Sequence, residues 1–143
     1  MPDPTRLADA LAAEHAAIFA YGLIGVELDG KTETEDARDA EAAHRLRRDA
    51  LVQTLADREA RAPVAEASYE LPFEVAGAEA ARRLAVLVEE RVGAVWRAAL
   101  PAVTGDDRAQ ALDALVDTAL RATGWRLAAG VEPATTAFPG APG

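Results

Sequence analysis

Apolar residues in the first part of the chain return every three or four positions, and one of these positions holds a carboxylate. The positions with this spacing are Leu7, Leu11, Glu14, Ile18, Tyr21, Gly25 and Leu28. Such spacing is typical of the buried face of an amphipathic helix. A buried carboxylate without a partner is costly or takes up a proton. Glu14 is therefore the first residue for which we expect a functional or an ion-paired role.

Three further segments show helical periodicity, and strand signals are absent. The four predicted helices cover about residues 4–28, 33–61, 77–100 and 106–129. The chain has 143 residues, which is enough for one domain with one hydrophobic core. We therefore predict an all-α fold in a single domain over residues 1–143, with an extended C-terminal tail at 131–143.

Residues typical of helix ends support these boundaries. Asp3 followed by Pro4 suits the N-cap and the first position of the first helix. Thr32 and Glu35 have the spacing of a capping box at the start of the second helix. Gly130 is expected to end the fourth helix in a left-handed conformation.

The links between the predicted helices differ in length. The first and third links are short and predict two antiparallel hairpins, whereas the middle link covers about residues 62–76. A link of ~15 residues reaches ~50 Å, and a helix of ~25 residues is ~37 Å long. The middle link can therefore cross the whole bundle, which is the connectivity of ferritin-like four-helix bundles. A loose loop in an up-down bundle is the alternative, but the apolar residues Tyr69, Leu71 and Phe73 favour a packed crossover between helices 2 and 3.

A glutamate and a histidine one turn apart follow in the second predicted helix, as Glu41 and His44. A Glu on one helix and Glu-x-x-His on the next form half of the ligand set of a carboxylate-bridged di-metal bundle. In the third helix Glu89 lies beside an apolar stripe and is the candidate for a further ligand. The candidate metal ligands are Glu14, Glu41, His44 and Glu89.

The second half of that ligand set is incomplete, because both histidines of the chain lie in the first two helices. A two-histidine di-metal site therefore cannot form within one copy, although a mononuclear or asymmetric site could. The competing interpretation is a buried ion pair of Glu14 with Arg47 or Arg48, because buried charges are usually paired. For Glu41 and His44 the competing interpretation is a solvated pair, and for Glu89 a solvent-facing charge.

Composition narrows the possible partners. The net charge of −9 argues against binding to nucleic acid or to anionic membranes, both of which need basic surfaces. The absence of cysteine excludes disulfides, thiolate metal sites and thiol nucleophiles. No signal peptide and no uncharged apolar run of membrane-spanning length is apparent, so we expect a cytoplasmic protein.

The C-terminal tail is uncharged after Glu132 and contains one large aromatic residue, Phe138, among prolines and small residues. Disordered tails are usually polar and charged. Prolines extend the backbone in advance and lower the entropy lost on docking. We therefore expect the tail to dock in a groove between helices, on the same chain or on a second copy, with Phe138 as its anchor.

Four segments together resemble an uncharacterised bacterial family of short ferritin-like proteins. They are residues 14–22 (EHAAIFAYG), 44–49 (HRLRRD), 69–73 (YELPF) and 136–140 (TAFPG). The first and last of these are the most specific. The resemblance implies a ferritin-like four-helix fold and no established activity. It also implies that Glu14, Glu41 and His44 match metal-ligand positions of true ferritins, whereas the Glu-x-x-His of the fourth helix has no counterpart.

These observations favour a non-enzymatic ferritin-like helical protein, forming a homodimer, in which a buried Glu–His–Arg network replaces a former metal centre. In that interpretation no cofactor is bound. The alternative is a metal-binding protein, or a metal-dependent oxidase or storage protein, that uses a reduced carboxylate–histidine site with iron or manganese. A third hypothesis is a small-ligand binder that uses space near Gly22 and Gly25. The residues leave open whether the protein is an enzyme.

Overall fold

Four long helices account for most of residues 3–142, the part of the chain that the computed structural model describes. The helices are α1 (Thr5–Glu27), α2 (Lys31–Asp57), α3 (Gly77–Ala99) and α4 (Gly105–Ala129), with a short 3-10 turn, η1 (Leu100–Ala102), between the last two. The described residues contain no strand. The predicted all-α class with four helices is confirmed.

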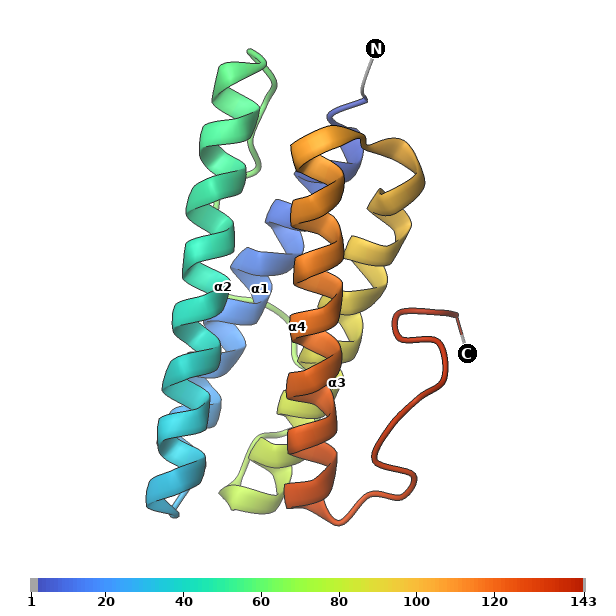
Figure 1. The fold of residues 1–143 in the computed structure, drawn as a ribbon. Helices are drawn as coiled ribbons and strands as arrows, with labels where there is room; N and C mark the ends of the chain where they lie inside the picture. Colours follow the sequence, from blue (N-terminus) through green and yellow to red (C-terminus); the bar gives the residue numbers. More distant parts are fainter. Residues whose placement is uncertain (1–2, 143) are drawn as a thin grey trace.

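Contacts at the helix ends give the directions of the helices. Arg82 near the start of α3 pairs with Glu33 near the start of α2, with 2.9 Å between Nε and Oε2. Arg58, just after the end of α2, pairs with Asp107 in the first turn of α4. α2 and α3 therefore run in the same direction, and α1 and α4 run opposite to them (Figure 1).

The link of residues 58–76 follows α1 along its length. The carbonyl oxygen of Pro63 lies 3.1 Å from Nε2 of His15. The ring of Tyr69 lies 5.5 Å from that of Phe19. At the end of the link the Gly77 N–H donates to Glu27 at 2.9 Å. The link thus returns the chain from the end of α2 to the opposite end of the bundle, where α3 begins (Figure 1).

The ends of α2 differ from their predicted positions. The helix begins after Gly30, and Oγ1 of Thr34 donates to the Gly30 carbonyl at 2.8 Å. Thr32 already lies within the helix, so the capping box predicted for it is wrong. The helix stops at Asp57 instead of about residue 61, because the backbone leaves helical geometry at Glu59, where φ is +54°.

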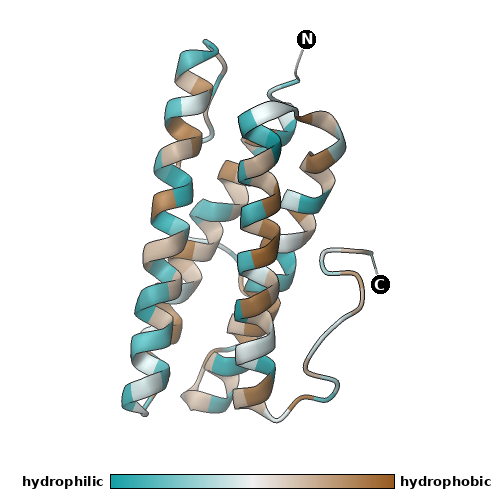
Figure 2. Cartoon of the chain, viewed as in Figure 1, coloured by the Kyte–Doolittle hydropathy of each residue, from teal (hydrophilic) through white to brown (hydrophobic). Residues whose placement is uncertain are grey.

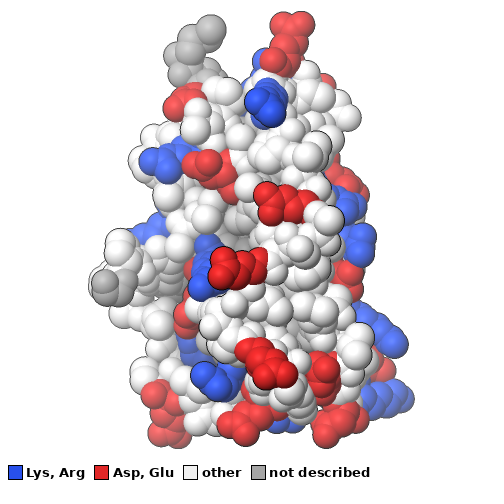
Figure 3. Space-filling view, turned by 180° about the vertical axis from the view of Figure 1, so that it is seen from behind, with Lys and Arg blue, Asp and Glu red and all other residues white. Residues whose placement is uncertain are grey.

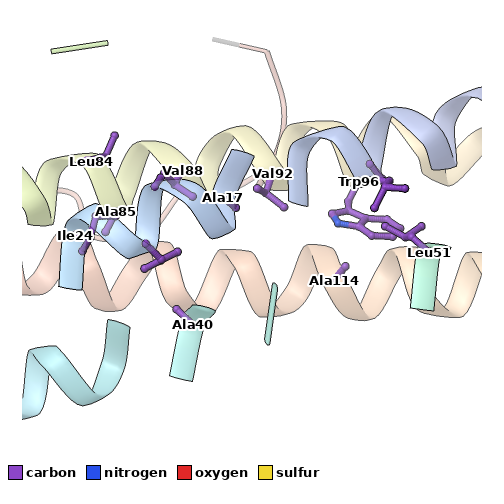
Figure 4. Packing of buried hydrophobic residues seen from close by; sticks show 14 of the residues in the cluster. Ala17, Ile24, Ala40, Leu51, Leu84, Ala85, Val88, Val92, Trp96 and Ala114 are labelled. Atoms are coloured by element: carbon purple, nitrogen blue, oxygen red, sulfur yellow. The ribbon is translucent and has the colours of Figure 1, made fainter. Parts of the chain in front are cut away.

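The core lies between the four helices and consists mainly of Leu, Val and Ala side chains. α1 packs against α2 and α3, and α3 packs against α4. Figure 4 shows side chains from all four helices in this cluster, among them Ile24, Ala40, Val88 and Ala114. Alanine at many of these positions lets the helices approach closely. A polar side chain in this core is therefore far from solvent.

Apolar residues also lie on the outer surface, and α4 carries more of the large ones than any other helix. Figure 2 shows hydrophobic positions along α4, whereas hydrophilic positions are frequent along α2. The exposed apolar residues of α4 are Leu112, Val116, Leu120 and Leu127, and we call them the α4 stripe. On the face turned away in that view, acidic and basic side chains are interspersed (Figure 3).

α1 is the most apolar helix of the described chain. By length and composition alone it passes the test for a membrane-spanning helix, which core helices of soluble proteins and signal sequences also pass. Its packed face includes the fully buried residues Leu7, Leu11 and Ile24, together with the carboxylate of Glu14. The apolar character of α1 is thus used for packing inside the bundle.

Candidate functional site

A histidine lies between two carboxylates in the centre of the core. Glu14 comes from α1, His44 from α2 and Glu89 from α3, and at most 1% of the surface of each residue is exposed. Nδ1 of His44 lies 2.5 Å from Oε2 of Glu14. Nε2 of His44 lies 2.9 Å from Oε1 of Glu89. The helical spacing that placed Glu14 in the buried face of α1 thus places its carboxylate against the neighbouring helices.

This geometry decides the protonation state of His44. Ionised carboxylates only accept hydrogen bonds, so an imidazole that bonds to one on each side must carry a proton on both nitrogens. Burial by itself lowers the pKa of His44, but the hydrogen bonds and charges of Glu14 and Glu89 outweigh it and raise the pKa to about 9. His44 is therefore a cation at neutral pH. Nη2 of Arg47 also lies 3.1 Å from Nδ1, but two donors face each other there and form no hydrogen bond.

Glu14 accepts three hydrogen bonds from three donors. Besides His44, these are Nε of Arg47 at 2.9 Å and the indole N–H of Trp96 at 2.8 Å. Burial raises the pKa of Glu14, but the hydrogen bond and charge of His44, the charge of Arg47 and the hydrogen bond of Trp96 lower it more, so the pKa falls below its ordinary value. A carboxylate held by such donors remains ionised inside the core.

Glu89 is bound on one oxygen only. Its Oε1 accepts from His44 and from the hydroxyl of Tyr21 at 2.6 Å, and the Trp125 indole N–H donates to that hydroxyl at 3.0 Å. Burial, followed by the charge of Glu89, raises the pKa of Tyr21 well above its ordinary value, so its proton stays on the phenol. Oε2 of Glu89 is buried and has no hydrogen-bond partner among the described residues.

Arg47 connects this centre to the fourth helix. Its Nη1 donates to Asp117 of α4 at 2.7 Å, and Arg121 of α4 donates to the same carboxylate oxygen at 3.0 Å. The ionised groups of this cluster are three carboxylates and three cations, so their formal charges balance. They are Glu14, Glu89, Asp117, His44, Arg47 and Arg121. The cluster, which we call the core ion network, joins all four helices.

Three of the four candidate ligands lie in the core ion network, and Glu41 does not. Glu41 lies next to the buried Ala40 in sequence, about 100° further around α2, and accepts a hydrogen bond from Arg45 at 2.7 Å near the surface. Glu89 is buried, not facing solvent. Arg47 is the partner of Glu14, whereas Arg48, the other arginine considered, pairs with its neighbour Asp49 at 2.8 Å.

Sequence reasoning missed several donors of the network. Trp96 and Trp125 are not among the candidate residues that the sequence indicates, yet both indole N–H groups donate into the site. The position of Trp96 on the apolar stripe of α3 was a signal that its ring lies inside. The pairing of Asp117 with Arg47 had no signal in the sequence, because the two residues are 70 positions apart.

The fold and the site together define an all-helical four-helix protein with a buried carboxylate–histidine network. The chain belongs to the family described as a domain of unknown function, DUF4439, whose match covers residues 6–143. Among solved structures it is similar to a conserved hypothetical protein, Rv2844, from Mycobacterium tuberculosis. The two share 41% identity with a TM-score of 0.83, over 87% of this chain and 94% of that one. No curated protein matches the chain.

Proposed function

We propose that this chain is a ferritin-like helical protein with a non-enzymatic role, in which the core ion network takes the place of a metal centre. The fold supports the ferritin-like relationship, because α2 and α3 run parallel and one long link follows α1 between them. One long crossover in a four-helix bundle is the connectivity of ferritin-like folds.

The observation that carries the proposal is the position of His44 between two carboxylates. A histidine binds a metal ion through the lone pair of a neutral imidazole nitrogen. Here both nitrogens point at carboxylate oxygens, at 2.5 Å and 2.9 Å, and both carry protons. No group of three or more His, Asp or Glu side chains in residues 3–142 is arranged to hold a metal ion. The residues therefore do not fit a ferritin-like metal centre.

Arg47 adds a second argument against a metal ion at this position. Its guanidinium donates to Glu14, so a positive charge occupies one side of the carboxylate that a metal would need. A divalent cation would have to displace Arg47 and the proton on the His44 nitrogen that it binds. Metal binding at such a site carries the cost of breaking the charge-assisted hydrogen bonds, which are the strong ones.

The core ion network instead determines how the four helices are placed relative to one another. Hydrogen bonds from α1 to α2 and α3, and from α2 to α4, require one relative placement of the helices. A core of alanine and leucine alone tolerates sliding of one helix against another, because its contacts are non-directional. In this proposal the core ion network fixes the register of the four helices.

The alternative function is metal binding at a reduced site formed by Glu14, His44 and Glu89. The observation that favours it is Oε2 of Glu89, which is buried without a partner in the described chain and could serve as a ligand. Iron or manganese would be the ions, and the protein would then be a storage protein or an oxidase.

Elemental analysis decides between the two. We would purify the parent protein and its Glu14→Ala and Glu41→Ala variants from cells supplemented with iron or manganese. The proposal expects no stoichiometric metal in any of them. Stoichiometric metal in the parent and in Glu41→Ala, lost in Glu14→Ala, would overturn it. Glu41 is the matched control, because it shares the Glu-x-x-His motif but lies outside the network.

We also propose a homodimer located in the cytoplasm. The dimer is supported by the α4 stripe, where four large apolar side chains on one helix are exposed. Exposed apolar patches often mark interfaces. The mass measured by light scattering after size-exclusion chromatography tests this: it should equal two chains, and a monomer at high protein concentration would contradict the proposal.

A further inference from the structure

A groove lies on the outside of the α3–α4 hairpin, and the C-terminal tail forms one of its walls. The groove has a volume of about 720 Å³. Residues from α3 and α4 line two sides, and residues 135–142 of the tail line the third. This size lies within the range of about 300–1,000 Å³ that is usual for small-molecule sites.

Arg126 of α4 donates to the Ala134 carbonyl of the tail at 3.3 Å, and two further contacts hold the tail against α3. The guanidinium of Arg97 donates to the Pro139 carbonyl at 2.9 Å. Gly140 has a φ of +76° and packs directly on the backbone of α3, where a Cβ atom would lie 2.7 Å from the Gly93 carbonyl oxygen. The expected docking of the tail is thus observed in the described residues. The expected anchor is wrong, because Phe138 is 71% exposed and the glycine two residues later makes the close contact.

One of the residues that line this groove, Glu89, has a buried acceptor atom without a partner. Glu89 lines the groove and is 1% exposed, and its Oε2 has no partner among the described residues. Thr118, which also lines the groove, donates its hydroxyl to the Leu115 carbonyl at 2.9 Å instead. A buried carboxylate oxygen left without a donor is unfavourable, so the site favours a molecule that brings one.

The charges around the groove indicate the kind of donor. The negative charge of Glu89 is already matched by the cation of His44 within the balanced core ion network. At the rim, Arg126 pairs with Glu90 at 2.6 Å, so these two charges also cancel. A cationic ligand would add an unmatched charge to a balanced site. A neutral N–H or O–H group satisfies Oε2 without that cost.

The rest of the lining is suited to an apolar body. Leu115, Val116 and Leu120 of α4 line one side, and Phe138 lines the opposite side from the tail. A large exposed aromatic residue over an apolar groove gains contact when a ligand fills the space between them. A ligand in the groove would thus explain why Phe138 is exposed although the tail itself is docked.

We propose that this groove binds a small, neutral, largely apolar molecule, whose N–H or O–H group donates to Oε2 of Glu89 while the tail covers it through Phe138. This proposal and the metal-binding alternative both use Oε2 of Glu89, and the elemental analysis of the parent protein described above distinguishes them.

The test uses two fluorescent probes that differ only in the donor. N-phenyl-1-naphthylamine is apolar and carries one N–H, and N-methyl-N-phenyl-1-naphthylamine lacks it. Each is titrated into the full-length protein, and its fluorescence increase reports binding in an apolar site. We expect saturable binding of the N–H probe, with the methylated probe weaker by about fivefold or more, the effect of one lost hydrogen bond.

Variants locate the site. Phe138→Ala removes the covering ring, and Gly140→Val detaches the tail; each should weaken the N–H probe by about fivefold or more. Leu46→Ala is the control, because Leu46 on α2 is equally exposed, at 71%, and lies outside the groove. Glu89→Gln should abolish the preference for the N–H probe. Light scattering on each variant checks the oligomeric state, because part of the α4 stripe also lines the groove.

Three outcomes would overturn the proposal. They are the absence of saturable binding of the N–H probe to the parent protein, equal binding of both probes, and unchanged binding in both tail variants. Phe138 and Gly140 lie outside the core ion network, so their variants keep the test decisive even if Glu89→Gln fails to fold.

Discussion

At the residue scale the molecule is organised around one cation, His44, enclosed by two carboxylates. Sequence spacing alone predicted that Glu14 lies in a buried helix face and that an arginine one turn beyond His44 pairs with it. It did not predict that Glu41 lies outside the site. The i, i+3 spacing puts Glu41 and His44 on the same side of α2, but the rotation of α2 about its own axis depends on how the helix packs. Nor could it predict which indole N–H groups point inward, since that depends on side-chain rotamers.

Removing Glu14 should destabilise the protein strongly. In Glu14→Ala the charges of His44 and Arg47 lose their shared partner inside the core, and breaking such a buried pair costs about 3–5 kcal/mol. Urea unfolding followed by circular dichroism measures this as a lower free energy of unfolding. Glu41→Ala, which removes an exposed pair, should change it by about 0.5 kcal/mol or less. Equal effects of the two substitutions would contradict the buried network.

Stability should fall on the alkaline side because of His44. Its pKa is raised from 6.5 to about 9 in the folded protein, so the stabilisation is complete below pH 6.5 and is lost as the pH rises through 9. The total effect is roughly 3 kcal/mol. The pKa of Glu14 is lowered, so its contribution is present above its ordinary value of 4.5 and is lost on further acidification.

The unfolding free energy, measured at a series of pH values, should thus be highest between pH 4.5 and pH 6.5, where both contributions are present. The matched variant His44→Gln should lack the decline between pH 6.5 and 9, although its overall stability is lower. A parent protein with constant stability across that interval would show that the imidazole is not held as a cation.

At the element scale, local sequence was informative wherever structure depends on near neighbours. Periodicity located all four helices, and Gly130 ends α4 in the left-handed conformation that was expected, with a φ of +69°. The end of α2 was placed too late, because residues 58–61 remain compatible with a helix in sequence and only the turn at Glu59 excludes it. The contact of Gly140 with α3 could not be predicted, since glycines in an extended tail have no periodic pattern.

Tail docking should depend on Gly140 and not on Phe138. Gly140→Val forces a side chain into the backbone of α3 and should expose the chain after Gly130 to proteases. Phe138→Ser removes a side chain that is mostly exposed, and the cleavage rate should stay close to that of the parent. Limited proteolysis with mass spectrometry measures both. Faster cleavage in Phe138→Ser than in Gly140→Val would show that the aromatic ring is the anchor after all.

At the scale of the whole molecule, the core ion network and the link of residues 58–76 determine how the two helix hairpins fit together. The network joins all four helices with balanced charges, and the link returns the chain along α1. Linker length predicted that such a return was possible, because ~15 residues can cross a bundle. Composition could not indicate whether the buried acids hold a metal ion or protein cations. Whether the acids bind a metal ion or pair with His44 and Arg47 depends on distances between side chains of different helices, and a local sequence pattern does not give those distances.

The most direct test of the central claim is the protonation state of His44 in metal-supplemented protein, measured by nitrogen-15 nuclear magnetic resonance of the imidazole. The chain has two histidines, so His15 serves as an internal reference. We predict that both ring nitrogens of His44 carry protons at neutral pH and that the ring titrates near pH 9. A nitrogen that is unprotonated at neutral pH and shifts when a chelator is added would show that His44 is a metal ligand and would contradict the account.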